Sequence, residues 1–567
     1  MLKIKAIRPE LLTLLASGFF LLAFNQALWQ HLLQITHADG QGWLLRGAFV
    51  LLILAVFNLA LTLLAFRRVL KPTLTVLLLC GAGAAYFMNQ YGTLINKEML
   101  RNIAETNPSE AFDLLSLKFA AYLLLLGVLP SWLVWQTPVN YRVWHRELLS
   151  KAAVMTGCLA MLGGVALANY QGLSSLFRNH HELRLMVTPS NIVGATSGYL
   201  REQLASAKQP FQVIASDALK SPSWQAHPRK SLTVLVVGES ARAENFGLLG
   251  YARNTTPELS QEDDLISFDN VYSCGTETAV SVPCMFSNMG RDGYKSAIAK
   301  NQDSLLDVLQ RAGLNVLWRD NQAGCKGACD RVTLEDLSQG HDPALCNSEE
   351  CFDEILLSNL QAYIDNLQQD SVLVLHQMGS HGPEYFKRVP KAFEKFTPVC
   401  TSNALNECTR EEIVNAYDNT ILYTDHVLAT LIDLLRKNQD QLDSGMLYLS
   451  DHGESLGEYN LFLHGAPYLM APEQQRHVSM FAWFSKGYQR DFNVSSQCLR
   501  DEHERPLSHD NLFHSMLGLL QVDTQAYDAR LDLFAHCRSQ STADQVLAVT
   551  HGKNDKTRVI QPARHSG

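Results

Sequence analysis

The hydrophobic pattern of the chain changes near residue 170. Before that point lie five long apolar stretches, each close to the roughly 20 residues that an α-helix needs to cross a bilayer. They cover residues 10–30, 43–66, 72–88, 117–135 and 152–169. We therefore expect an α-helical membrane domain of five transmembrane helices over residues 1–170. The first stretch is long and has no clear cleavage site, which indicates a retained helix rather than a signal peptide.

After residue 230, short apolar runs alternate with amphipathic segments. Four runs are typical of buried parallel strands: SLTVLVVGES (231–240), GLNVLWRD (313–320), SVLVLHQMG (371–379) and SGMLYLSDHG (444–453). Segments between them, such as SLLDVLQRAG and AYDNTILYTDHVLATLIDLLRKN, have helical spacing. This alternation predicts a doubly wound α/β domain over residues 231–540, in which ligands gather beyond the carboxyl ends of the strands.

Two further segments flank this α/β domain. Residues 171–230 mix polar and amphipathic stretches, and we interpret them as an interfacial connector with helices lying on the membrane. A plain surface linker explains the same residues nearly as well. Residues 541–567 are polar and without periodicity, so we expect a disordered tail.

Charge divides the chain at the same place. Residues 1–170 hold 13 Lys and Arg against 7 Asp and Glu, although the whole chain has a net charge of −9. This pattern predicts a membrane anchor that carries a soluble domain, and it argues against a nucleic-acid partner. Basic residues precede the first apolar stretch and lie between the second and third and between the fourth and fifth. The positive-inside rule therefore places the N-terminus in the cytoplasm, and five crossings place the residues after 170 outside it.

Ten of the twelve cysteines lie in the soluble part of the chain. This density suits an oxidising compartment such as the periplasm. Four pairs are close neighbours in the sequence and the fifth is what remains, although connectivity cannot be deduced from a sequence alone. The expected disulfides are Cys274–Cys284, Cys325–Cys329, Cys346–Cys351, Cys400–Cys408 and Cys498–Cys537. A zinc cluster at residues 325–329 is the competing interpretation, but no matching His/Cys pair follows.

Acidic and imidazole side chains follow two of the predicted strands. Glu239 follows the first strand, and Asp451 and His452 follow the last. Singly, each has an ordinary explanation as a turn residue or as an acid at the start of a helix. Together they offer two carboxylates and an imidazole, which suits zinc with an open fourth position.

The segment SCGTETAVSVPCMFS (273–287) offers hydroxyl groups for that open position. Cys274 and Cys284 bracket Thr276, Thr278 and Ser281. One interpretation is a surface loop closed by a disulfide. The other is a nucleophile held against a metal, since a metal lowers the pKa of an oxygen bound to it.

Together with VVGESARAENFGLLGY, WRDNQAGCKG, HQMGSHGP and YLSDHGESLGE…LHG, this segment resembles the lipid A phosphoethanolamine transferases of the alkaline-phosphatase/sulfatase superfamily. That family includes the mobile colistin-resistance enzymes, and the resemblance covers nearly the whole chain. It implies a monomeric enzyme of the bacterial inner membrane with a periplasmic catalytic domain. The implied reaction moves phosphoethanolamine from phosphatidylethanolamine to a lipid A phosphate through a phosphothreonine, releasing diacylglycerol and conferring polymyxin resistance.

The resemblance also implies site residues, each taken from a matching motif. Thr278, rather than Thr276, is the expected nucleophile. The expected site comprises Glu239, Thr278, Asp451 and His452 as ligands of one firmly bound Zn²⁺, together with His381, His464 and Lys326. The two further histidines would hold the phosphoryl group or a second zinc, and the lysine would lie near the substrate phosphate.

A segment between the third and fourth apolar stretches carries a further set of candidates. In NKEMLRNIAETNPSEAF, Asn102, Thr106 and Glu110 recur every four residues, so one helix would carry them on one face. Alone, this pattern favours a solvated helix face. The resemblance places contacts to the donor head group on this segment, and a carboxylate suits the ethanolamine ammonium.

Three alternative functions remain open at this stage. The same metal site would serve a transferase that modifies a core sugar or another glycan, or that moves glycerol phosphate. It would also serve a phospholipid hydrolase, or remain in a non-catalytic scaffold. A sulfatase is disfavoured, because Cys284 follows Pro283 and no arginine completes the C/S-x-P-x-R motif.

Overall fold

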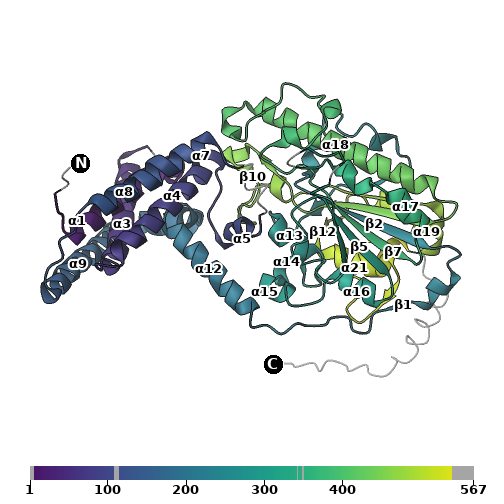
Figure 1. The fold of residues 1–567 in the computed structure, drawn as a ribbon, viewed down its shortest axis with the longest axis horizontal. Coiled ribbons are helices and arrows are strands. Elements are labelled where there is room, and N and C mark those ends of the chain that lie inside the picture. Colours follow the sequence, from purple (N-terminus) through teal and green to yellow (C-terminus); the bar gives the residue numbers. More distant parts are fainter. Residues whose placement is uncertain (1–4, 37, 107–113, 341, 348–349, 539–567) are drawn as a thin grey trace, which may run out of the picture.

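A helical domain and an α/β domain lie side by side in the computed structural model (Figure 1). The structure describes residues 5–36, 38–106, 114–340, 342–347 and 350–538. The expected disordered tail (541–567) therefore lies outside the described residues.

The helical domain contains the apolar stretches. Its helices are α1 (Pro9–Ala23), α2 (Gln26–Ile35), α3 (Gly40–Leu63), α4 (Leu70–Tyr91), α5 (Lys97–Glu105), α7 (Leu117–Tyr122), the π-helical η1 (Leu123–Val128), α8 (Leu129–Gln136) and α9 (Trp144–Ala168). Within the described residues, α3, α4, the run from α7 to α8, and α9 are each long and apolar enough to cross a membrane. Helices α1 and α2 make a fifth span only if they are counted as one pair bent by 62°. The predicted membrane domain is confirmed, with four to five spans.

The expectation of one continuous helix over residues 10–30 is wrong, because Asn25 interrupts it. The Asn25 amide donates to the backbone oxygens of Phe20 and Thr188, at 2.8 Å each. The Thr188 backbone N–H donates back to the Asn25 side-chain oxygen at 2.9 Å. Asn25 is fully buried, so its side chain caps α1 and at the same time ties the break to a segment 163 residues later.

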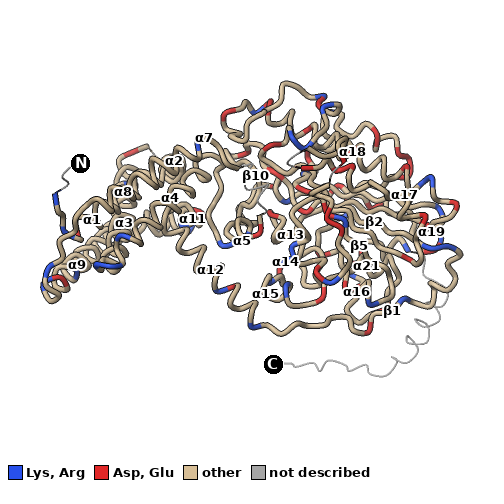
Figure 2. The backbone as a smooth tube through the Cα atoms, viewed as in Figure 1, with Lys and Arg blue, Asp and Glu red and all other residues tan. Residues whose placement is uncertain are grey.

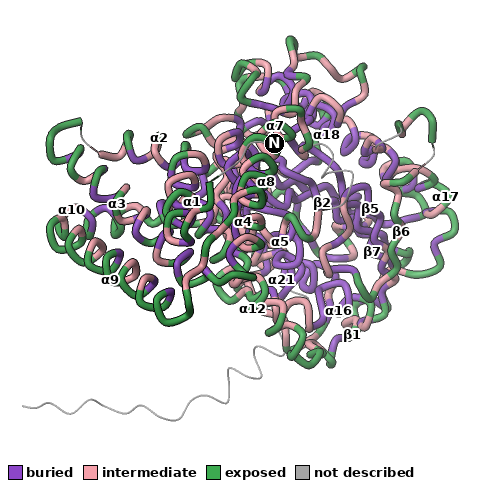
Figure 3. The backbone as a smooth tube through the Cα atoms, turned by 60° about the vertical axis from the view of Figure 1, so that its left-hand side comes forward, coloured by how far each residue is buried: buried purple, intermediate pink, exposed green. Residues whose placement is uncertain are grey.

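The surface of the helical domain is apolar, as expected for contact with lipid. Helix α9 is exposed along much of its length (Figure 3), with Leu148, Leu149, Leu159 and Leu167 more than half exposed. Charged residues are sparse along the helices, and basic residues gather at the end that faces away from the α/β domain (Figure 2). Exposed leucines of this number would be unfavourable in water and are the expected surface of a membrane domain.

Three helices connect the last span to the α/β domain: α10 (Tyr170–Asn179), α11 (Leu183–Met186) and α12 (Ser190–Ser206). Leu173, Leu176 and Leu183 are buried in the same hydrophobic cluster as the membrane helices. Glu202 of α12 is paired with Lys97 of α5 at 3.1 Å. The connector is therefore packed on the membrane domain at its start and bound to α5 near its end.

A seven-stranded sheet forms the centre of the α/β domain. Its order is β3 (Ile266–Phe268), β11 (Met480–Phe484), β8 (Asp443–Ser450), β2 (Ser231–Gly238), β7 (Ser371–His376), β5 (Asn315–Asp320) and β6 (Thr333–Asp336). The five strands from β8 to β6 are parallel, and β11 is antiparallel to both of its neighbours. All four predicted strands are present in the parallel part. The sequence pattern missed β3, β6 and β11.

Both faces of the sheet are covered, as the continuous apolar runs require. Along β2, Leu235 and Val237 point into one hydrophobic cluster, and Val234 and Val236 point into another. The first cluster includes residues of α13 (Thr278–Met285), α16 (Leu305–Arg311) and α21 (Asp510–Leu519). The second includes residues of α17 (Leu360–Asp365) and α18 (Arg410–Lys437). The buried strands stand out in Figure 3.

The remaining α-helices and strands of this domain are short. They are α14 (Gly290–Gly293), α15 (Ser296–Ala299), α19 (Lys486–Asp491), α20 (Ser496–Asp501), β1 (Leu219–Lys220), β4 (Val271–Tyr272), β9 (Ser455–Leu456), β10 (Phe462–Leu463), β12 (Leu507–Ser508) and β13 (Val522–Asp523).

All five expected disulfides are present. The bond between Cys325 and Cys329 rules out the competing zinc cluster at that position. Cys80 and Cys158 of the membrane helices remain free.

The disulfides differ in the length of chain that they close. Cys498 and Cys537 are 39 residues apart, and Cys346 and Cys351 are 5 apart. In the chain-entropy account, the longer loop adds about 4 kcal/mol and the shorter about 2 kcal/mol. Replacing both cysteines by serine should therefore lower the unfolding temperature more for the 498–537 pair, as measured by near-UV circular dichroism. Equal losses would contradict this entropic account.

Candidate active site

Two neighbouring strands position the acidic residues of the site. Gly238 at the end of β2 pairs with Ser450 at the end of β8, so Glu239 and Asp451 leave the sheet side by side. Glu239, Asp451 and His452 are fully buried, and their ligand atoms lie within 4.8 Å of one another. The three predicted zinc ligands are thus together at the carboxyl edge of the sheet.

The orientation of these side chains suits a metal. The Nε2 atom of His452 lies 3.3 Å from a carboxylate oxygen of Glu239 and 3.3 Å from Oδ2 of Asp451. The Nδ1 atom of His452 lies 2.9 Å from the Gly453 carbonyl oxygen, which fixes the proton on Nδ1 and leaves the Nε2 lone pair facing the carboxylates. Asp451 Oδ2 is buried and accepts no hydrogen bond. An open oxygen, a second carboxylate and an unprotonated nitrogen fit zinc.

The two carboxyl groups oppose each other electrostatically. Burial and the negative charge of Glu239 raise the pKa of Asp451 well above its usual range. Burial alone would also raise the pKa of Glu239, but the nearby imidazoles, with His452 foremost, hold it below its usual value. Without a cation, a proton is therefore held by Asp451 rather than by Glu239, as expected for two like charges close together.

The hydroxyl group beside this set belongs to Thr278, the first residue of α13. Its Oγ1 donates to Glu239 Oε2 at 3.0 Å and lies 3.2 Å from His452 Nε2. Thr276 instead donates to the Ala466 carbonyl oxygen at 2.7 Å. The geometry therefore presents Thr278, and not Thr276, to the three candidate ligands.

A disulfide and a hydrogen bond hold helix α13 in place. The Cys274–Cys284 disulfide closes the segment, and the Ser281 hydroxyl bonds to the Asp451 carbonyl oxygen. Buried His509 lies 3.2 Å from the same hydroxyl through Nδ1. The nucleophile candidate is thus fastened to the strand end that supplies the ligands.

The two further histidines lie next to the ligand set. The rings of His452 and His464 are 4.5 Å apart, and those of His464 and His381 are 5.7 Å apart, between centroids. Nδ1 of His464 lies 3.1 Å from a carboxylate oxygen of Glu454, whereas buried Nδ1 of His381 has no hydrogen-bond partner. Glu454 thereby orients His464, a role that the sequence did not reveal.

The expected substrate contacts are spread around this centre. Lys326 donates from Nζ to the backbone oxygens of Ala323 and Glu105, at 2.9 and 3.2 Å. Asn102 lies on α5, but the helix ends at Glu105 and Thr106 is its extended cap residue. The expectation that one helix carries all three candidates is therefore wrong for Thr106, and Glu110 lies outside the described residues.

Asp320 at the end of β5 and Gln322 just after it also reach the site, and sequence reasoning missed both. Gln322 donates from Nε2 to Glu239 Oε2 at 3.2 Å. Asp320 lies 2.7 Å from Nδ1 of His376, which is fully buried and whose Nε2 has no partner. Only one ring nitrogen of this buried histidine therefore has a hydrogen-bond partner among the described residues. The rule that polar residues after parallel strands meet at one edge would have found Asp320 and Gln322.

Glu277, directly before the nucleophile candidate, is another buried acid that was missed. It is 2% exposed, and within the described residues neither of its carboxylate oxygens has a hydrogen-bond partner. A side-chain atom added to Gly465 would lie 3.4 Å from Glu277 Oε2 and 3.2 Å from the methyl group of Met99. The carboxyl group thus lies between α5 and the residue after His464. Burial raises its pKa to about 8, which the charge of Arg101 offsets only in part.

Fold and site together define a membrane-bound protein of the alkaline-phosphatase/sulfatase superfamily. Residues 231–522 match the family model described as Sulfatase, and residues 53–204 match the one described as Phosphoethanolamine transferase EptA/EptB. The chain belongs to the EptA family of phosphoethanolamine transferases.

Full-length relatives support this assignment. The phosphoethanolamine transferase EptA of Escherichia coli K12 is 42% identical over 535 residues, covering 93% of this chain and 97% of that protein. The phosphatidylethanolamine transferase Mcr-1 of Escherichia coli is 40% identical over 458 residues, covering 79% and 84%. The structure of the integral membrane lipooligosaccharide phosphoethanolamine transferase A from Neisseria meningitidis superposes with a TM-score of 0.91 at 35% identity, covering 94% of this chain and all of that one.

Removal of zinc should destabilise the α/β domain, because it leaves two buried carboxyl groups facing each other. A ligand present at 1,000 times its dissociation constant adds about 4 kcal/mol to the free energy of unfolding. We expect chelation to lower the unfolding temperature and added zinc to restore it. In His452→Ala the response should be greatly reduced, and an undiminished response would place the metal elsewhere.

Proposed function

We propose that this protein transfers phosphoethanolamine from phosphatidylethanolamine to a phosphate group of lipid A, with Thr278 as the covalent carrier. The observation that carries the proposal is the Thr278 hydroxyl, held within hydrogen-bond distance of Glu239 and His452 at a buried donor set that fits zinc. A transferase needs a nucleophile beside its metal, whereas a metal-binding scaffold does not. The position of the Thr278 hydroxyl therefore favours group transfer.

In the first half-reaction, Thr278 Oγ1 forms a bond to phosphorus as the bond from phosphorus to the diacylglycerol oxygen breaks. The proton lost by Thr278 is balanced by the proton that diacylglycerol gains. His464, oriented by Glu454, is placed to deliver that proton, and His381 to hold a phosphoryl oxygen. Lys326 adds positive charge near the site once it leaves its carbonyl partners.

In the second half-reaction, an oxygen of a protonated lipid A phosphate bonds to the same phosphorus as the bond from phosphorus to Thr278 Oγ1 breaks. The proton that the lipid A phosphate loses passes to the Thr278 oxygen. Glu239, Thr278, Asp451 and His452 would hold the zinc, and a second ion could be held only with the help of His381 and His464. Zinc, when bound, supplies positive charge that lowers the pKa of a hydroxyl and stabilises charge on phosphoryl oxygens. This effect is stronger where water is excluded and the surrounding polar groups are held in place. The site residues are buried, so these conditions are met here.

The head group of the donor needs a partner for its ammonium group, and we assign Glu277 to it. Its carboxyl group is buried, belongs to the residue before Thr278 and has no hydrogen-bond partner among the residues that the structure describes. Such burial is costly unless a cation lies close by. Asn102, Thr106 and Glu110 remain candidates for the same head group from the membrane-domain side. Of the two acids considered for this role, Glu277 lies within the described residues and directly precedes Thr278.

The acceptor assignment rests on the relatives. The Neisseria meningitidis protein is a lipooligosaccharide phosphoethanolamine transferase, and its chain is 35% identical. The Kdo(2)-lipid A phosphoethanolamine 7''-transferase of Escherichia coli K12, named for a sugar acceptor, is 26% identical over 550 residues. Both named acceptors contain lipid A, which supports lipid A as the acceptor. The addition of a positively charged group lowers the negative charge of the outer membrane, which would reduce binding of cationic polymyxins.

The proposed location is the bacterial inner membrane, with the N-terminus in the cytoplasm and the catalytic domain in the periplasm. The basic residues at the far end of the membrane domain support this orientation (Figure 2). Five disulfides support an oxidising compartment. We also propose that the enzyme acts as a monomer.

Replacing Thr278 by alanine should abolish the modification of lipid A. The measurement is mass spectrometry of lipid A from cells that express wild type, Thr278→Ala or the control Thr276→Ala. We expect a gain of phosphoethanolamine with wild type and with the control only. A modified lipid A from Thr278→Ala would move the nucleophile to another hydroxyl, whereas no modification with wild type would remove lipid A as the acceptor.

Glu277→Gln should weaken use of the donor while leaving the zinc content unchanged. A lost hydrogen bond to a charged group costs about 1.5–3 kcal/mol, so the half-saturating concentration of phosphatidylethanolamine should rise about 10- to 100-fold. Glu98→Gln, on the neighbouring α5, is the matched control and should be near wild type. The role of Glu277 would be disproved by an unchanged half-saturating concentration in Glu277→Gln.

A further inference from the structure

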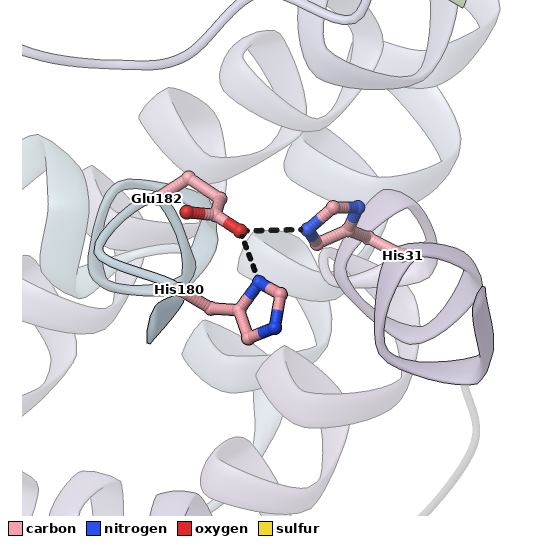
Figure 4. Close-up of side chains that lie close together, drawn as sticks. All are labelled: His31, His180 and Glu182. Carbon is pink, nitrogen blue, oxygen red and sulfur yellow. Dashed lines mark hydrogen bonds and ion pairs between the residues drawn. The ribbon is translucent and has the colours of Figure 1, made fainter. Parts of the chain in front are cut away.

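A second group of metal-binding side chains lies outside the active site, at the junction of the membrane domain and the connector. It consists of His31 on α2, His180 at the end of α10 and Glu182 at the start of α11 (Figure 4). We propose that these three residues bind a zinc ion that fastens α2 to the connector.

The donor atoms already converge on one point. Nε2 of His31 lies 3.1 Å from Glu182 Oε1, and Nδ1 of His180 lies 2.9 Å from the same oxygen. One ligand atom from each residue lies within 4.8 Å of the other two. Two imidazoles and one carboxylate with an open fourth position form a donor set that zinc uses in proteins.

The protonation of the group also permits a metal. Each ring has a second nitrogen, Nδ1 of His31 and Nε2 of His180, for which the described residues offer no hydrogen-bond partner. That nitrogen can carry the proton to water while the other donates its lone pair, as metal binding requires. Among the described residues, no lysine or arginine pairs with Glu182, so its charge is not already neutralised by a fixed cation.

Access and surroundings are suitable as well. The side chains of His31 and His180 are each 30% exposed and that of Glu182 is 21% exposed, so an ion and one water can reach them. Apolar packing beneath fixes the elements, since Leu28 and Leu32 of α2 lie in one cluster with Leu183 of α11. The site is thus held together before a metal arrives.

The location suggests what the ion does. Asn25, at the break before α2, is already hydrogen-bonded to Thr188 of the connector. A zinc ion on His31, His180 and Glu182 would add a second link between the same two parts of the chain. Helix α11 is followed by α12 and then by the catalytic domain. The ion would therefore stabilise the attachment of the catalytic domain to the membrane helices.

The test is the zinc content of the full-length protein in detergent, measured by mass spectrometry after incubation with zinc chloride and desalting. His452→Ala removes the catalytic ion and leaves the second group intact. We expect one zinc per chain in His452→Ala, none when His180→Ala is added, and one when His181→Ala is added instead. His181 is the exposed neighbour in the sequence and serves as the matched control.

Two results would overturn the proposal: no zinc in His452→Ala, or the same zinc in His452→Ala with and without His180→Ala. In either case the group is a hydrogen-bonded His–Glu–His bridge. Should the His180 variant fail to fold, as judged by circular dichroism, Glu182→Gln in the His452→Ala background gives the same comparison. Because the readout is metal content, the result does not depend on which reaction the enzyme performs.

Discussion

The repulsion between two buried carboxyl groups, Glu239 and Asp451, is the constraint on which the site depends. Parallel pairing of β2 with β8 forces them to emerge side by side, and both are completely buried. Such a pair is costly unless a cation or a proton intervenes. The surrounding residues serve that arrangement: His452 turns its lone pair inward, Gln322 donates to Glu239, and Ser281 ties the helix of the nucleophile to Asp451. The carboxyl edge of the sheet therefore positions the groups that the proposed chemistry needs.

A second theme is the contact between the membrane domain and the catalytic edge. Helix α5 lies between them: Lys300 of the α/β domain pairs with Glu105 at 2.5 Å, and Lys326 donates to the Glu105 backbone oxygen at 3.2 Å. Met99 of the same helix lies against the Gly465 and Glu277 region. A segment that follows a membrane helix thus reaches the region of Glu277, the residue before Thr278. This arrangement suits a lipid donor, whose head group must meet Thr278 while its acyl chains stay in the bilayer.

Much of this could be predicted from the sequence, and the exceptions have physical causes. Continuous apolar runs predicted the four central strands. The even cysteine set predicted all five disulfides, four from close spacing and the fifth as the remaining pair. Strand β6 (TLED) is polar, and β11 (MFAWF) has no alternation to distinguish it from a helix segment. The break at Asn25 depends on a partner 163 residues away, which no local pattern contains. Within the site, the candidate ligands could be predicted from their places after strands. The possible roles of Glu277 and Glu454 depend on their burial and on the groups they face, which the sequence does not contain.

The most direct measurement is mass spectrometry of peptides from the purified enzyme after incubation with phosphatidylethanolamine and no acceptor. The account predicts phosphoethanolamine on the peptide that contains Thr278, and its loss when lipid A is added. Phosphoethanolamine on another residue, or none on a protein that still transfers the group to lipid A, would contradict the covalent role of Thr278.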